Sequence, residues 1–146
     1  MPLLGGHRGA NRLAVEIAEG LGAVAAVTTA GDVAMGVALD APPEGYRLAN
    51  PGDAKGAMAA MLAGEGVSVV GENIFGVEDA GGAVELVVSE APVEGGERRL
   101  VYHPQRHVIG VGCARNADPE ELWELVQDTL AEAGIAPGAV ACVATI

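Results

Sequence analysis

Three short polar stretches contain the residues whose types and spacing could do chemistry. The first, GGHRGAN at residues 5–11, brackets a histidine and an arginine with glycines where a helical pattern begins. Backbone N–H groups at a helix N-terminus can bind an anion, because they are unpaired and lie at the positive end of the helix dipole. The candidate binding residues are Gly6, Arg8, Gly9 and Asn11, with His7 as a candidate base.

A tight turn is the competing interpretation of this first stretch. Its spacing matches neither the P-loop nor the G-x-G-x-x-G fingerprint. In a turn, the glycines would supply positive φ angles and Asn11 would bond locally. A histidine such as His7 is also more typical of a hydrogen-bonding turn than of a catalyst. The residues alone favour the turn.

The second stretch, VTTAGD at residues 27–32, follows an apolar run that predicts a strand. Ligands of open α/β sheets lie outside the carboxyl ends of strands, so Thr28, Thr29 and Asp32 are candidate ligand contacts. A turn rich in Thr and Asp explains the same composition and is favoured on composition alone.

The third stretch, GVGCARNADPEE at residues 110–121, runs from a predicted strand into a capped helix. Gly112 and Arg115 are candidate substrate contacts, because Arg115 could hold a carboxylate through two hydrogen bonds. A solvated surface arginine is an equal alternative. Cys113 would be a nucleophile only as a thiolate, and no histidine partner for it is identifiable. We therefore interpret Cys113 as a structural or pocket-lining residue.

Two further histidines, His103 and His107, flank Pro104 and Arg106. Metal binding would need a third ligand, and the sequence identifies none. We interpret both histidines as residues of a connecting segment. Cys113 and Cys142 form neither a disulfide framework nor a C-x-x-C motif.

Three helices are predicted to position these stretches. Apolar residues recur with a helical period at residues 10–21, 54–62 and 119–133. Asp53 and Asp118 are predicted N-caps, because acidic side chains can accept bonds from the first helical N–H groups. In the first helix the predicted buried stripe is Ala10, Leu13, Ala14, Ile17, Ala18 and Leu21. In the third it is Leu122, Leu125, Val126, Thr129, Leu130 and Ala133.

The predicted strands cover residues 24–28, 67–70, 84–88, 100–102, 108–111 and 140–144. The scarcity of aromatic residues implies a core of Ala, Val, Leu and Ile, which is typical of parallel sheets covered by helices. We predict an α/β fold of small modules with a mainly parallel sheet, ending in a βαβ unit at residues 107–146. Residues 89–106, polar and rich in Pro and Gly, predict a linker or hairpin between modules.

Charge and hydropathy exclude several classes of protein. The 146 residues carry 20 acidic and 8 basic side chains, for a net charge of −12. Nucleic-acid binding is disfavoured, because neutralising phosphates needs a basic face. No apolar run reaches the length of a membrane span, and no signal peptide is recognisable. We expect a soluble, cytoplasmic protein that binds no membrane.

Two long phrases, in this order, resemble the cobalt-precorrin-5A hydrolase family (CbiG). GGHRGANRLAVEIAEGLGAVAAVTTAGD, residues 5–32, is similar to the family's GHxGGANxLAxxIAxxLGAxxVITTATD stretch. The phrase from HPQRHVIGVGCARN to ACVATI, residues 103–146, resembles the opening of the family's C-terminal domain, with its GxGCxRxxxxEEL start and AxxxxATI strand. The resemblance makes residues 1–88 the end of the N-terminal portion plus a middle α/β region. Residues 107–146 then begin the C-terminal domain.

The resemblance implies a role in cobalamin (vitamin B12) biosynthesis. The family opens the δ-lactone on ring A of cobalt-precorrin-5A and releases acetaldehyde, giving cobalt-precorrin-5B. Helix N-termini with Arg8 and Arg115 would then bind peripheral carboxylates. His7 would be the candidate base, and backbone N–H groups after Gly9 or Gly112 would stabilise the oxyanion.

The resemblance also implies what the protein would need and bind. Cobalt would arrive inside the substrate, so no cofactor and no protein metal site are expected. The expected partners are the cobalt-precorrin tetrapyrrole and other corrin-pathway enzymes, and a homodimer is left open. The alternative is a non-catalytic tetrapyrrole-binding module associated with, or fused to, a precorrin methyltransferase.

This sequence departs from the family pattern in length and in two residues. The family's N-terminal portion normally precedes the GGH phrase by many tens of residues, and its C-terminal domain continues beyond Ile146. We therefore expect a fragment truncated at both ends, and the activity of this chain alone is left open. The loop after His7 has one glycine fewer than the family form, and Gly31 replaces a usual threonine.

Overall fold

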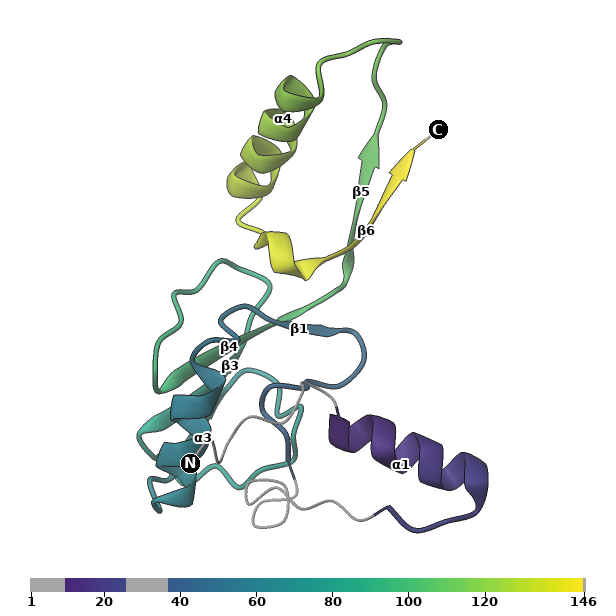
Figure 1. Cartoon of the computed structure of the whole chain (residues 1–146). Helices are drawn as coiled ribbons and strands as arrows, with labels where there is room; N and C mark the ends of the chain where they lie inside the picture. The colour runs from purple at the N-terminus through teal and green to yellow at the C-terminus, as the bar shows by residue number, and fades with distance from the viewer. Residues whose placement is uncertain (1–9, 26–36, 146) are drawn as a thin grey trace.

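Four strands form the larger of two sheets in the computed structural model, which describes residues 10–25 and 37–145, with the side chains of residues 10 and 11 outside that description (Figure 1). The order across the sheet is β1-β4-β3-β2, with β2–β3 and β3–β4 parallel and β1–β4 antiparallel. The strand bounds are Tyr46–Leu48 for β1, Val67–Val70 for β2, Val84–Val88 for β3 and Arg99–Pro104 for β4. The prediction of an α/β fold with a mainly parallel sheet is confirmed.

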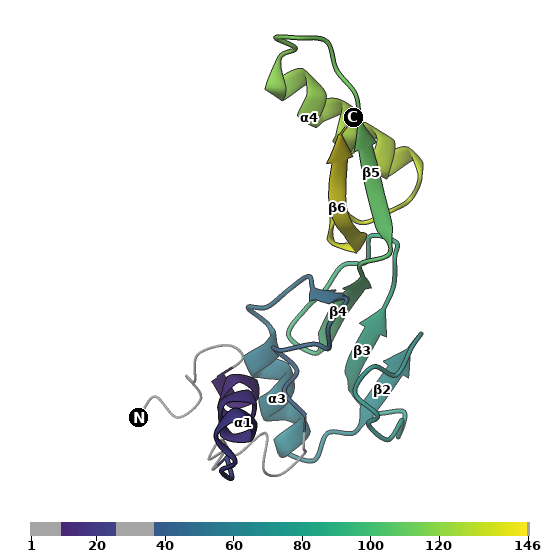
Figure 2. The ribbon, with the colours of Figure 1, turned by 90° about the vertical axis from the view of Figure 1, so that its right-hand side faces the viewer.

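One helix packs on this sheet and closes the main core. α3, at Ala54–Leu62, lies against β3 and β4, and its alanines allow a close approach (Figure 2). Tyr102 lies at the centre of the core, and its hydroxyl donates to the Leu39 carbonyl at 2.9 Å. The rings of Phe75 and Tyr102 pack edge to face, with their centroids 5.2 Å apart. The buried cluster comprises Leu39, Leu48, Ala54, Ala57, Ala60, Met61, Val67, Val84, Leu86, Leu100 and Tyr102.

The second sheet confirms the predicted βαβ unit. β5, at His107–Val111, pairs in parallel with β6, at Val140–Thr145, and α4, at Pro119–Glu132, connects them. As predicted, Asp118 caps α4, because its Oδ1 accepts from the Glu120 N–H at 2.9 Å. Both views show this unit beyond the end of the larger sheet (Figure 1, Figure 2).

The two units meet at η1, a 3-10 turn at Pro137–Ala139. The Ala136 N–H donates to the Glu90 carbonyl at 2.7 Å, and the Arg106 N–H donates to the Ala139 carbonyl at 3.1 Å. A Cβ at Gly138 would stand 2.5 Å from Cδ2 of the buried His103 ring, so η1 lies directly against β4. Residues 99–104 of the predicted linker or hairpin form β4, a central strand that contains the strand predicted at residues 100–102, and the division at residues 89–106 stays a prediction.

Several local predictions are wrong. Val24 and Ala25 are irregular rather than extended, with Val24 96% exposed, and the rest of the predicted strand 24–28 lies outside the described residues. Asp53 does not cap α3 through its side chain; its carboxylate instead accepts from the Asn50 amide at 2.8 Å. β1 is absent from the predicted strands, because three residues show no period.

The buried stripes predicted for α1 and α4 are mostly uncovered. In α1, at Ala10–Leu21, Ala18 is buried, whereas Leu13, Ile17 and Leu21 are more than half exposed. In α4 only Leu130 is buried. A two-stranded sheet is too narrow to cover a helix face, which explains the exposure of α4.

Candidate functional site

Most of the first two predicted stretches lies outside the described residues. This holds for Gly6, His7, Arg8, Gly9, Thr28, Thr29 and Asp32. Asn11 lies in the first turn of α1, with its side chain undescribed. The roles of these residues stay predictions.

The third stretch follows the carboxyl end of β5, as predicted. Gly112, Cys113 and Arg115 lie in the loop between β5 and α4, where Asn116 has a φ of 65° and the Ala117 N–H closes a turn onto Ala114 at 3.2 Å. Cys113 and Arg115 are exposed. Cys113 does not line the cavity between α4 and β5, so it is neither buried nor pocket-lining there.

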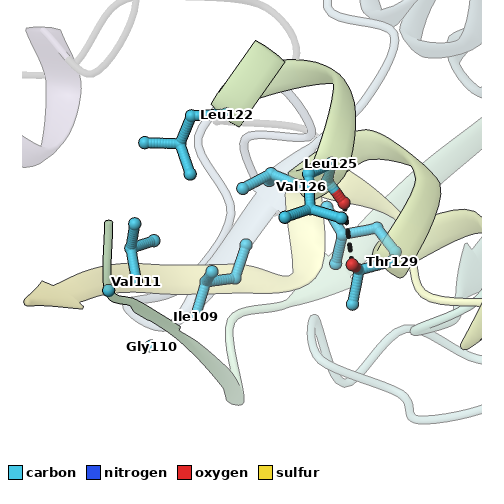
Figure 3. A pocket seen from close by; sticks show the side chains of 9 residues that line it. Ile109, Gly110, Val111, Leu122, Leu125, Val126 and Thr129 are labelled. Atoms are coloured by element: carbon cyan, nitrogen blue, oxygen red, sulfur yellow. Dashed lines mark hydrogen bonds between the residues drawn. The ribbon is translucent and has the colours of Figure 1, made fainter. Parts of the chain in front are cut away.

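This cavity, of about 160 Å³, opens between α4 and β5 (Figure 3). Side chains of Ile109 and Val111 rise from β5 toward Leu122 and Val126 of α4. Its one hydroxyl belongs to Thr129, which donates to the Leu125 carbonyl at 2.7 Å. The volume corresponds to about five water molecules and the walls are apolar, so the cavity suits neither a macrocycle nor a carboxylate.

A polar cluster lies instead at the carboxyl ends of the three parallel strands. We call Tyr46, Glu72, Glu90, Arg106 and His107 the carboxyl-edge cluster. Glu72 and Glu90 each come two residues after the end of their strand, β2 and β3, whereas Arg106 and His107 follow β4. Tyr46 starts β1, which is antiparallel and therefore begins at the same edge.

Arg106 links the two glutamates of this cluster. Its Nη2 donates to Glu72 Oε2 at 3.0 Å, and its Nη1 lies 3.5 Å from Glu90 Oε1. The other oxygen of Glu90 bonds His107 Nε2 at 2.9 Å. Hydrogen bonding to Glu72 raises the pKa of Tyr46, which ties this phenol to the same network. The side chains of Glu72, Glu90, Arg106 and His107 are 31–57% exposed, so the cluster is open to solvent.

Sequence reasoning missed this cluster because its members are scattered between residues 46 and 107. A signal exists: four of the five side chains follow a parallel strand, the same rule that draws attention to residues 27–32 and 110–121. The interpretation of His107 as a connecting residue did not include its partner, the carboxylate of Glu90. His103 is instead buried in β4, with its Nδ1 2.6 Å from the Ser89 carbonyl oxygen. Within residues 10–25 and 37–145, no group of three or more His, Cys, Asp or Glu side chains could hold a metal ion.

The mainly parallel sheet with a helix packed on it places the chain among the α/β proteins. Two family models match within the chain: "Cobalamin synthesis G N-terminal" at residues 1–32 and "Cobalamin synthesis G C-terminus" at residues 107–146. In these two segments, and in the same order, the chain is similar to the N-terminal and C-terminal parts of CbiG-type proteins.

One solved structure is similar over 99% of this chain: the crystal structure of a protein from Sulfolobus solfataricus described as a cobalamin biosynthesis protein G homolog. The identity is 22% and the TM-score is 0.37. The chain spans 46% of that protein's length. No curated protein matches this chain. Within the described ranges, every helix is too short or too polar to cross a membrane.

Proposed function

We propose that this chain takes part in the hydrolytic opening of the ring A δ-lactone of cobalt-precorrin-5A, with release of acetaldehyde to give cobalt-precorrin-5B. The observation that supports the proposal is the match of both family segments in their proper order. The family matches support the pathway, cobalamin biosynthesis, and the reaction is our inference from the resemblance of residues 5–32 and 103–146.

The chemistry requires an activated water, donors for a developing oxyanion, and groups that hold a large polycarboxylate. Arg115, exposed in the loop before α4, is the group proposed to hold a peripheral carboxylate, because Asp118 already caps the N-terminus of this helix. Backbone N–H groups after Gly112 are the proposed oxyanion donors, with His7, Arg8 and Gly9 in the corresponding roles at the first stretch.

We further propose that the protein needs no cofactor of its own, because the substrate brings its cobalt. The net charge of −12 repels the carboxylates of the cobalt-precorrin tetrapyrrole, so local arginines and backbone N–H groups must bind them. We propose a cytoplasmic location and contact with other corrin-pathway enzymes. A homodimer stays an open alternative to a monomer.

The test is release of acetaldehyde, measured by coupled reduction with NADH and alcohol dehydrogenase. The protein encoded by the complete reading frame and the 146-residue chain are each incubated with cobalt-precorrin-5A under anaerobic conditions. We expect acetaldehyde and cobalt-precorrin-5B in equal amounts from the former. A folded protein that binds the substrate and releases no acetaldehyde would refute the hydrolase and support the tetrapyrrole-binding module.

Two variants test the first stretch of residues. His7→Ala should lower turnover and leave the melting temperature unchanged, and a fully active variant would remove His7 from the mechanism. Gly9→Val should weaken folding and substrate binding together, because a β-branched side chain rarely takes a positive φ. Unchanged stability and affinity would remove the glycine loop from the site.

A further inference from the structure

We propose that His107, oriented by Glu90, is an acid–base group of the carboxyl-edge cluster and serves the lactone hydrolysis, an inference that rests on the proposed function. The cluster belongs to none of the three stretches that the sequence singled out. Its histidine has a carboxylate partner at 2.9 Å, whereas the buried His103 bonds only to a backbone carbonyl at 2.6 Å.

One hydrogen bond, between Nε2 and Glu90, orients the imidazole. Nε2 faces Glu90, so a proton on Nε2 is held by the carboxylate and Nδ1 is the nitrogen that can accept a second one. The side chain of His107 is 31% exposed, which leaves the ring accessible to a ligand. A base that is oriented by a carboxylate resembles the arrangement of His and Asp in hydrolase triads, although the fold is unrelated.

Glu90 is itself held from both units of the molecule. Its side chain bonds His107 and lies 3.5 Å from Arg106, and its carbonyl accepts from the Ala136 N–H at 2.7 Å. The backbone contact holds residue 90, and the two side-chain contacts orient its carboxylate. Glu90 is therefore a positioning residue.

Several titratable and charged side chains lie on the elements around His107. They are Glu90, Arg106, Glu72, Tyr46, the buried His103 and the thiol of Cys142 on β6, the strand that pairs with β5. One guanidinium faces two carboxylates, so the cluster without His107 carries a net negative charge. β6 and η1 contribute no carboxylate, amine or guanidinium.

The position suits a large, flat substrate. The cavity between α4 and β5 is too small and too apolar for such a ligand, whereas the carboxyl-edge cluster is open to solvent. The carboxyl-edge cluster also lies at the junction of the two units, because His107 is the first residue of both β5 and the C-terminal family segment and closely follows β4. In this proposal the lactone edge of the tetrapyrrole lies across that junction, next to the imidazole.

The proposed step balances as an ester hydrolysis. Nδ1 of His107 takes a proton from a water molecule whose oxygen forms a bond to the lactone carbonyl carbon. The tetrahedral oxyanion collapses, the ring C–O bond breaks, and the imidazolium returns the proton to the leaving alkoxide. Lactone and water thus become a hydroxy acid, with no redox change.

The experiment compares two variants and one matched control in the protein from the complete reading frame. His107→Gln keeps a donor for Glu90 but cannot titrate, and Glu90→Gln removes the orienting charge. Glu65→Gln is the control: it removes a carboxylate paired with Arg98 at 2.7 Å and 2.8 Å, at the opposite edge of the same sheet. Acetaldehyde release is measured from pH 5 to 9.

We expect His107→Gln to lower kcat by about 10²–10⁴-fold with little change in KM, the range for loss of an acid–base group. The rise in activity between about pH 5 and 8 that a histidine base produces should disappear. Imidazole should restore activity to His107→Ala, which a merely structural role would not allow. Glu65→Gln should behave like the wild type.

The failures of the two proposals are distinguishable. A wild-type protein that releases no acetaldehyde overturns the hydrolase and this inference with it. An active wild type whose His107→Gln variant keeps its kcat and pH profile overturns the inference alone. The inference alone is also overturned if imidazole fails to rescue a folded His107→Ala. As an independent readout, Glu90→Gln should lower kcat while its melting temperature stays that of the wild type, and an unchanged kcat contradicts the role of the pairing.

Discussion

Replacing Tyr102 with phenylalanine removes one buried hydrogen bond and little else. The Tyr102 side chain is fully buried, and its hydroxyl donates to the Leu39 carbonyl at 2.9 Å. The phenylalanine ring can keep the edge contact with Phe75. Because the carbonyl loses its donor inside the core, we expect the free energy of unfolding near pH 7 to fall by about 1–3 kcal/mol.

The same variant should behave differently at high pH. Burial, with a smaller contribution from the charge of Asp40, raises the pKa of Tyr102 far above its ordinary value of 10.0. The phenol therefore stays neutral in the folded state while it ionises in the unfolded chain above pH 10. This contribution to stability is complete below pH 10. Above pH 10 the free energy of unfolding of the wild type falls by about 1.4 kcal/mol per pH unit. The phenylalanine variant has no such loss.

The measurement is urea unfolding followed by circular dichroism at pH 7, 9, 10 and 11. The difference in the free energy of unfolding between the wild type and Tyr102→Phe should be constant up to pH 9. At pH 11 it should be smaller by about 1.4 kcal/mol. Tyr46→Phe is a comparison at pH 7 only, because the phenol of the half-buried Tyr46 bonds the exposed Glu72, so its loss should cost no more than about 1 kcal/mol. An equal stability of Tyr102→Phe and wild type at pH 7, or a gap unchanged at pH 11, would refute the reasoning.

Three further substitutions test the packing of η1 on β4, the side-chain bonds of Asn50 to β4, and the N-cap of α4. Gly138→Ala should lower stability by about 1–3 kcal/mol in thermal unfolding, because the new Cβ meets the His103 ring, whereas Gly112→Ala has open space and should not. Equal melting temperatures would contradict the close packing. Asn50→Ala should cost about 2 kcal/mol in urea unfolding, since its carboxamide makes two bonds to the β4 backbone, at 2.9 Å and 3.0 Å. A loss under about 0.5 kcal/mol would exclude that role. Asp118→Ala should cost about 1 kcal/mol and some helical signal in circular dichroism, and no change would mean the cap is dispensable.

Much of the fold could be predicted because its elements carry strong local signals. The bounds of β2 and β3 coincide with their predicted runs, and the period and caps located α3 and α4 to within a residue or two. β1 escaped notice because three residues cannot show a period, and its pairing to β4 depends on chain more than 50 residues away. The middle of β4 was predicted as a strand at residues 100–102, and the buried run extends to residue 104, inside a segment whose polar flanks predict a linker or hairpin.

The candidate site was harder to predict because it depends on strand order. The loop at Gly112–Arg115 follows from local sequence, since a strand leads directly into a capped helix. The carboxyl-edge cluster arises only once β2, β3 and β4 lie parallel and adjacent, with Tyr46 brought in by an antiparallel neighbour. Strand order is a tertiary property, so no window of sequence could have joined Glu72 to Arg106.

The narrow β5–β6 sheet has a consequence for how the protein behaves at high concentration. Val108 and Val143 are 59% and 64% exposed, and neither strand contains a lysine, glutamate or proline that would block strand addition. Repulsion between copies carrying a net charge of −12 opposes aggregation through these edges. Added salt screens that repulsion, so concentrated samples should aggregate more readily as ionic strength rises.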